Sequence, residues 1–114
     1  MTTRPHILVI CGKNKRRSRT AEQIFKNDSR IHIRSAGLSP KSDRKISEKD
    51  ITWANLIFVM EKDHKEKIIE IYRELELPEI SVLYIPDEFE FMDEELIDKL
   101  TEGINYTLKE VFQL

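Results

Sequence analysis

The chain has 114 residues, of which 39% are apolar and 35% are charged, and this length and composition predict one domain over residues 1–114. No apolar run approaches the ~20 residues that a membrane-spanning helix needs. The short apolar run near the start does not fit a signal peptide, so we expect a cytoplasmic protein. The single cysteine excludes an internal disulfide and a zinc site built from several cysteines.

The charge is divided unevenly along the chain, although the net charge is only −2. Residues 1–53 contain 13 Lys and Arg against 5 Asp and Glu, a balance of +8, whereas residues 54–114 contain 6 against 16, a balance of −10. This polarity predicts a basic anion site on one part of the molecule and a solvated acidic surface on the other.

The first half of the chain predicts two strands and two helices. Residues 6–10 form a β-branched apolar run typical of a strand buried on both faces. A basic segment follows over residues 11–17, and then comes a helix over residues 18–25 for which Ser18 is a candidate N-cap. Residues 32–35 predict a short strand, and the capping-box pattern of residues 47–50 precedes a short helix that carries Trp53, which we expect in the core.

The second half continues the alternation. Residues 55–60 predict another buried strand, and Asp63 is the candidate N-cap of a helix that Pro78 ends. Residues 80–85 predict the fourth strand, and Asp93 is the candidate N-cap of the last helix. The apolar side of the helix after Asp63 is expected to comprise Ile68, Ile69, Ile71, Tyr72 and Leu75.

Strands that alternate with helices predict an α/β fold with a parallel sheet covered on both faces. Sheets of this kind bind ligands at the carboxyl ends of their strands. The basic segment of residues 11–17 follows the first strand directly, so it is expected at such an end.

The chemistry-bearing motif is Cys11, five residues, Arg17 and Ser18. Backbone N–H groups at a strand–helix junction bind anions, and an arginine can hold two phosphate oxygens. The positive field favours the thiolate form of Cys11, which could attack a bound phosphoryl group and form a phosphocysteine intermediate. The simpler alternatives are a buried cysteine that only packs and a basic run that is a solvated or nucleic-acid-binding surface.

The motif and its flanking stretches resemble the low-molecular-weight protein tyrosine phosphatase superfamily, in particular its short bacterial branch of predicted tyrosine phosphatases. The stretches that carry the resemblance are residues 7–11, Asn14, residues 17–18, 21–22, 35–37, 44–50, 56–61 and 85–87, and the final helix. The resemblance implies a three-layer α/β/α fold with a four-stranded parallel sheet in the order 2-1-3-4.

The resemblance also implies roles for individual residues. Cys11 matches the nucleophile, Arg17 the phosphate-binding arginine and Asp87 the general acid. Asn14 and Ser18 match residues that shape the loop and hydrogen-bond the thiolate, and Ser35 matches a serine of the same network. The phosphate-binding loop then comprises Gly12, Lys13, Asn14, Lys15, Arg16 and Ser18.

Two carboxylates compete for the role of general acid. Asp87 follows the fourth strand and is expected over the same sheet edge as Cys11. Asp93 lies six residues later, where a helix N-cap is its simpler role. We therefore favour Asp87. Phe89 and Phe91, between them, are either core residues or an aromatic wall beside the leaving group.

The sequence departs from the family pattern at several positions. Gly12 follows Cys11 directly, and Lys13 stands where the family usually has glycine. Arg16 replaces the second cysteine of many members, so a protective disulfide is not expected. Lys41 lies near the position of a family histidine, and the segment between Gly37 and Arg44 is short, which makes substrate choice the least transferable property.

The expected partner is a phosphorylated substrate, either a phosphotyrosine protein or a small or nucleic-acid phosphomonoester. The basic residues Lys13, Lys15 and Arg16 leave open a nucleotide, an RNA end or an acidic phosphopeptide, as well as a non-catalytic phosphate-binding or RNA-binding module. Arsenate reduction would require an external thiol. No cofactor or metal is expected, because the three histidines lack ligand spacing, and no membrane partner is expected.

Overall fold

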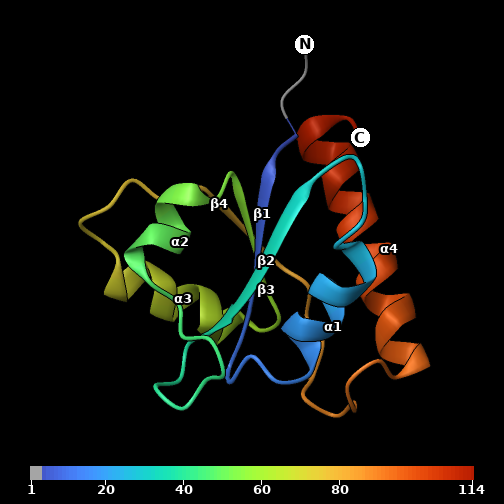
Figure 1. Cartoon of the computed structure of the whole chain (residues 1–114). Coiled ribbons are helices and arrows are strands. Elements are labelled where there is room, and N and C mark those ends of the chain that lie inside the picture. The colour runs from blue at the N-terminus through green and yellow to red at the C-terminus, as the bar shows by residue number, and fades with distance from the viewer. Residues whose placement is uncertain (1–3) are drawn as a thin grey trace.

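The computed structural model describes residues 4–114. Strands and helices alternate along the chain, as Figure 1 shows. The elements are β1 (His6–Cys11), α1 (Arg17–Phe25), β2 (His32–Gly37), α2 (Glu48–Trp53), β3 (Leu56–Val59), α3 (Lys62–Ile71), β4 (Glu79–Val82) and α4 (Glu94–Phe112).

The four strands form one parallel sheet in the order β2-β1-β3-β4, which confirms the predicted fold class and strand order. In the register of β1 with β2, Cys11 lies beside Gly37, and Ile10 lies between Ala36 and Val59. Because all strands run the same way, their carboxyl ends share one edge of the sheet, the lower edge in Figure 1.

The sheet is covered on both faces, as expected from the continuous apolar runs of the central strands β1 and β3. Helices α1 and α4 lie on one face, and α2 and α3 lie on the other (Figure 1). Alternate residues of β1 supply the two cores: Ile7 and Val9 pack on the side of α1 and α4, and Leu8 and Ile10 on the side of α2 and α3. The amphipathic α4 buries Leu96, Leu100, Ile104 and Leu108.

The predicted helix starts are right for two helices and wrong for two. Asp93 caps α4 by accepting from the backbone N–H groups of Glu95 and Leu96, and Ser47 forms the predicted capping box with Asp50. Ser18, in contrast, lies inside α1, because the helix already begins at Arg17. Asp63 lies in the first turn of α3, whose N-cap is Glu61.

Two predicted element ends are also wrong. Helix α3 ends at Ile71, well before Pro78, and Ile69 and Ile71 are exposed although they were expected on its apolar side. Strand β4 ends at Val82 and does not reach Ile85, because Tyr84 has a φ of 56° and turns the chain out of the extended conformation.

Trp53, expected in the core, is partly buried at the end of α2 and packs against the core on the side of α2 and α3. Within residues 4–114, no helix is long and apolar enough to cross a membrane.

Candidate active site

A cleft of about 440 Å³ opens at the carboxyl ends of the strands, next to the junction between β1 and α1. It receives side chains from three separate parts of the chain. Its lining residues are Cys11, Gly12, Lys13, Lys15, Arg16, Arg17, Glu61, His64 and Asp87. Cys11, Arg17 and Asp87, which the sequence singled out for chemistry, therefore face one cavity.

The loop between β1 and α1 is anchored through its carbonyl groups. The N–H groups of Leu38, Ser39 and Asp43 donate to the carbonyl oxygens of Cys11, Gly12 and Lys13, at 3.1, 2.8 and 3.3 Å. The N–H of a peptide group points opposite to its C=O. The N–H groups of residues 12–14, which belong to these same peptide groups, therefore face away from residues 38–43. In the described part of the chain, no N–H of residues 12–16 donates a hydrogen bond. Free amides before a helix start are suited to an anion.

Gly37 at the end of β2 allows this loop to approach the sheet. A Cβ atom at Gly37 would lie 2.8 Å from the backbone nitrogen of Asn14 and would collide with the Ser42 side chain. Gly12 has no such constraint, since a Cβ there would meet nothing within 4 Å. The close approach of the loop between β1 and α1 to the sheet therefore depends on Gly37 of β2 and not on Gly12 of the loop itself.

Cys11 lies at the end of a chain of buried side-chain hydrogen bonds. The Asn14 amide donates to Ser18 Oγ at 2.8 Å, and Ser18 Oγ lies 2.9 Å from Cys11 Sγ. Since Ser18 Oγ accepts from Asn14, its own hydrogen is available to the sulfur. Asn14 holds the left-handed φ of 54° that asparagine tolerates better than most residues. This arrangement stabilises a negative charge on the sulfur.

Arg17, the first residue of α1, is buried and fixed at one end of its guanidinium group. Its Nη1 donates to Glu61 Oε2 and to the carbonyl oxygen of Ile85, both at 2.7 Å. Its Nε lies 3.8 Å from Asp87 Oδ1. The arginine is thus tied both to the segment after β3 and to the segment after β4.

The two candidate acids, Asp87 and Asp93, have different surroundings in the structure. Asp87 lines the cleft and its side chain is 62% exposed, whereas Asp93 is absent from the lining and has its carboxylate engaged in capping α4. Phe89 packs against the core on the side of α1 and α4, and Phe91 is exposed; neither lines the cleft.

Ser35 is buried in β2, two residues before Gly37. Its hydroxyl donates to Glu22 of α1. Within residues 4–114 it makes no hydrogen bond to Asn14 or Ser18, so it holds α1 against β2 at a distance from the hydrogen bonds of the cysteine. Lys41 has its backbone N–H bound to the Ser39 hydroxyl and is exposed.

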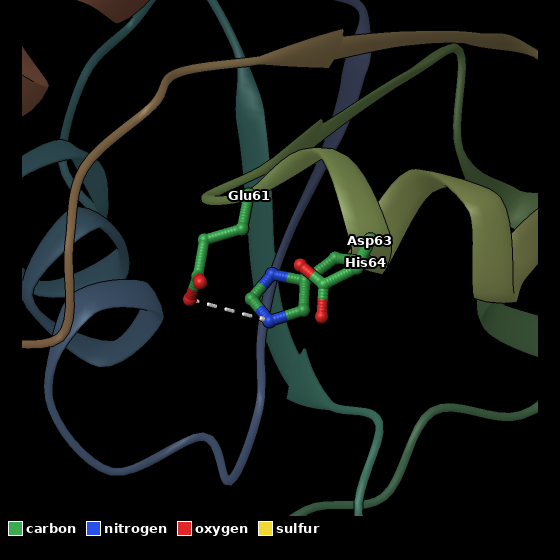
Figure 2. Close-up of side chains that lie close together, drawn as sticks. All are labelled: Glu61, Asp63 and His64. Carbon is green, nitrogen blue, oxygen red and sulfur yellow. Dashed lines mark ion pairs between the residues drawn. The ribbon is translucent and has the colours of Figure 1, made fainter.

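Glu61 and His64 complete the cleft, and sequence reasoning assigned neither a role. His64 Nε2 lies 3.6 Å from Glu61 Oε2, and Figure 2 shows the carboxylate and the ring facing one another. The His64 ring is buried, and within the described residues its Nδ1 has no hydrogen-bond partner. Burial lowers the pKa of His64, and the negative charges of Glu61 and Asp63 oppose this effect only in part.

Glu61, Asp63 and His64 offer three potential metal-ligand atoms that lie within 4.8 Å of one another. Glu61 is, however, already bound to the Arg17 guanidinium, and Lys13, Lys15 and Arg16 line the same cleft. This field opposes a cation. We assign the three residues no metal; Glu61 instead binds Arg17, and His64 lies beside the Glu61 carboxylate.

One sequence signal could have indicated Glu61. It lies two residues after the buried strand β3 ends at Val59, and the carboxyl end of β3 shares an edge with that of β1. Polar residues directly after buried parallel strands collect at this edge. His64 carries a weaker signal, its spacing of three residues from Glu61 across a helix start.

Neither protein-family models nor the curated proteins give a match to this sequence. Solved structures do match. SP-PTP, a low molecular weight protein tyrosine phosphatase from Streptococcus pyogenes, aligns with 94% of this chain and 93% of its own at a TM-score of 0.78 and 18% identity. Wzb from Vibrio vulnificus, solved in complex with benzylphosphonate, aligns with 96% of this chain and 100% of its own, at a TM-score of 0.72 and 19% identity. The YwlE arginine phosphatase from Geobacillus stearothermophilus aligns with 94% of this chain and 97% of its own, at a TM-score of 0.62 and 20% identity.

The chain has the fold of the low-molecular-weight protein tyrosine phosphatases. The expected resemblance is thereby confirmed at the level of architecture. Identities of 18 to 20% show the fold alone, and the chemistry of this chain depends on the residues of its own cleft.

Proposed function

We propose that this protein is a cysteine-dependent phosphomonoester hydrolase of the protein tyrosine phosphatase type. The observation that carries the proposal is the shared cleft of Cys11, Arg17 and Asp87, which come from the ends of β1, α1 and the segment after β4. Nucleophile, anion-binding group and proton donor are the three parts that hydrolysis of a phosphate ester needs.

Substrate binding would use the donors that the fold leaves free. Both donors of Arg17 Nη1 are taken by Glu61 and Ile85, which leaves Nε and Nη2 for two oxygens of a phosphoryl group. The unpaired amides of residues 12–16 would hold the remaining charge. The same donors would stabilise the charge that develops in the transition state.

The first chemical step would be attack by the Cys11 thiolate on phosphorus. A sulfur–phosphorus bond forms while the ester oxygen–phosphorus bond breaks, and protonated Asp87 gives its proton to the departing oxygen. The hydrogen-bond donors Ser18 and Asn14 would support the thiolate before the attack. No cofactor is required for this step.

The second step would release the enzyme. Asp87, now ionised, takes a proton from water as the water oxygen attacks phosphorus, and the sulfur–phosphorus bond breaks to regenerate the thiolate and free phosphate. Exposure of Asp87 gives water access to its carboxylate. Its 3.8 Å contact with Arg17 Nε supports a role beside the proposed phosphate site.

The rim of the cleft supports a proposal for the substrate class. Lys13, Lys15 and Arg16 are exposed around the loop, and only Arg16 has a long contact with an acid, 3.9 Å to Glu90. This rim suits a phosphotyrosine flanked by acidic residues, which is the substrate that we propose. A nucleotide or an RNA end with a terminal phosphate is the alternative that the same charge would accept.

The test is hydrolysis of p-nitrophenyl phosphate by the wild type and by Cys11→Ser, Asp87→Asn and Asp93→Asn. Cys11→Ser should abolish turnover, and Asp87→Asn should lower kcat by ~10²–10⁴-fold, while Asp93→Asn keeps near-wild-type turnover because its side chain still accepts in the cap. Mass spectrometry of quenched Asp87→Asn should detect a phosphorylated cysteine. Full turnover by Cys11→Ser would refute the mechanism.

A panel of substrates distinguishes the classes. It comprises acidic phosphotyrosine peptides, phosphoarginine peptides, mononucleotides, and RNA with 2′- or 3′-phosphates. The proposal expects the highest kcat/KM for the acidic phosphotyrosine peptides. A preference for a phosphorylated RNA end would leave the cysteine mechanism intact and replace the substrate.

A further inference from the structure

A second basic hollow, of about 490 Å³, lies at the opposite end of the sheet from the cleft. It is built around the first residues of β1 and β2, His6 and His32, whereas Cys11 ends β1. The two sites are thus about 17 Å apart along β1. Its lining residues are Arg4, His6, Lys26, Ile31, His32, Ile33, Arg34 and Trp53.

The floor of this hollow is an ordered stack of aromatic and cationic side chains. The His6 ring lies on the Trp53 indole with 4.5 Å between centroids and 9° between planes, and the Arg34 guanidinium lies 4.1 Å from the indole centroid. His6 Nδ1 donates to the Trp53 carbonyl oxygen at 2.9 Å, and His32 meets His6 edge-on at 5.3 Å. Packing and hydrogen bonds therefore fix the stack before any ligand arrives.

The charges around the stack are positive and largely uncompensated. No carboxylate lines the hollow, and within residues 4–114 neither Arg4 nor Lys26 forms an ion pair. Arg34 has only a 3.8 Å contact with Asp50, whose carboxylate is held at 2.8 Å by Arg44. Partial desolvation, and to a smaller extent the neighbouring Arg4 and His6, lower the pKa of His32.

We propose that this hollow binds single-stranded nucleic acid. Phosphates of the strand would contact Arg4, Lys26 and Arg34, and a base would stack on the exposed ring of His32 or on the outer face of the Arg34 guanidinium. A cluster of cations alone would accept any polyanion. The stacked rings among the cations are what favour a ligand with bases, because base stacking supplies affinity that an acidic peptide cannot gain.

The site would act independently of hydrolysis. It lies at the amino ends of the strands, shares no lining residue with the cleft, and would hold phosphodiesters that the cleft is not expected to cleave. It also gives a role to basic residues of the first half of the chain that the cleft does not use.

Tryptophan fluorescence can report binding at this site. Trp53 is the single tryptophan of the chain and lies in the hollow. Titration with an oligoadenylate of eight nucleotides that has hydroxyl groups at both ends, and so no phosphomonoester, should change its fluorescence. Binding should weaken with salt, because each contacted phosphate of a single strand contributes a slope of about −0.7 in log K against log salt concentration.

Matched charge removals test the location. Lys26→Gln and Arg34→Gln should each weaken binding at least fivefold and lower the salt slope by about 0.7. Lys15→Gln at the rim of the cleft and Lys109→Gln on α4 remove the same charge elsewhere and should leave the affinity unchanged. Since Arg34 touches the indole, anisotropy of a dye-labelled oligoadenylate gives a second measure of affinity for every variant.

Three results would overturn the proposal. The first is an absence of any change in Trp53 fluorescence or anisotropy at low salt. The second is weaker oligoadenylate binding by Lys15→Gln with unchanged binding by Lys26→Gln, which would place the bound oligonucleotide at the cleft. The third is a peptide of eight glutamates that binds as tightly as the oligoadenylate, which would show that charge alone is recognised.

Discussion

Arg17 Nη1 lies 2.7 Å from Glu61 Oε2. This contact joins the first residue of α1 to the residue that precedes α3, so the orientation of the proposed phosphate-binding group depends on a carboxylate 44 residues away in sequence. Arg17 is buried, and if Glu61 were removed its guanidinium would keep, as its ion pair, only the longer 3.8 Å contact with the Asp87 carboxylate.

Replacing Glu61 should therefore impair substrate binding more than chemistry. We expect Glu61→Ala to raise KM for p-nitrophenyl phosphate by about tenfold, which corresponds to one charge-assisted hydrogen bond, and to weaken inhibition by inorganic phosphate similarly. Steady-state kinetics measure both. Asp63→Asn, on the same helix start but exposed, is the control and should change KM little. An unchanged KM in Glu61→Ala would mean that Ile85 alone orients Arg17.

His64 should make the stability of the fold depend on pH. Burial lowers its pKa in the folded protein below the ordinary value of 6.5, so near that value the unfolded chain binds more protons than the folded one. The free energy of unfolding is then highest above pH 6.5 and falls as the pH drops from there toward the folded-state pKa.

Urea unfolding at pH 7.5 and at pH 5 should show a smaller loss of stability for His64→Gln than for the wild type. His32→Gln is a partial control, because the pKa of His32 is also lowered although its ring is exposed. If the wild type and His64→Gln lose the same stability between pH 7.5 and pH 5, His64 does not contribute to the pH dependence of stability.

Ser18 should affect the reactivity of Cys11, because its hydroxyl lies 2.9 Å from the sulfur. In Ser18→Ala, Cys11 loses its neighbouring hydroxyl, and a hydrogen bond to a charged group is worth about 1.5–3 kcal/mol. We expect alkylation of the single cysteine by iodoacetamide at pH 7 to slow by about ten- to a hundredfold. Ser39→Ala removes a hydroxyl that only accepts from Lys41 and should alkylate normally. Equal rates in both variants would remove the proposed role of Ser18.

Gly37 and Gly12 provide a matched pair for the shape of the loop. Gly37→Ala would force a Cβ against the Asn14 backbone and Ser42, whereas Gly12→Ala adds a methyl group in open space. We expect Gly37→Ala to cost about 1–3 kcal/mol of stability and most of the activity, with little effect of Gly12→Ala on stability. Thermal unfolding and initial rates measure the two effects. Similar behaviour of both variants would contradict the close approach of loop and strand.

The sequence predicted the succession of elements well where one residue pattern dominates. Residues 7–10 are apolar without interruption, and such a run is typical of a strand between two covering layers, which β1 confirms. Asp93 and Ser47 have the cap chemistry and lie at helix starts. Ends set by long-range contacts were less predictable: α3 ends at Ile71, because the following Tyr72, Leu75 and Leu77 leave the helix to pack against the core.

The sequence by itself determined the α/β architecture and placed Cys11, Arg17 and Asp87 at the ends of elements, because periodicity and strand order are local or topological properties. Only the tertiary structure decided which side chains meet. It placed Ser18 inside α1 and not at its N-cap, and it brought Glu61 to Arg17 with His64 beside Glu61. It also stacked His6 and Arg34 on Trp53. These contacts join residues distant along the chain, and the packing of strands and helices, not local pattern, brings them together.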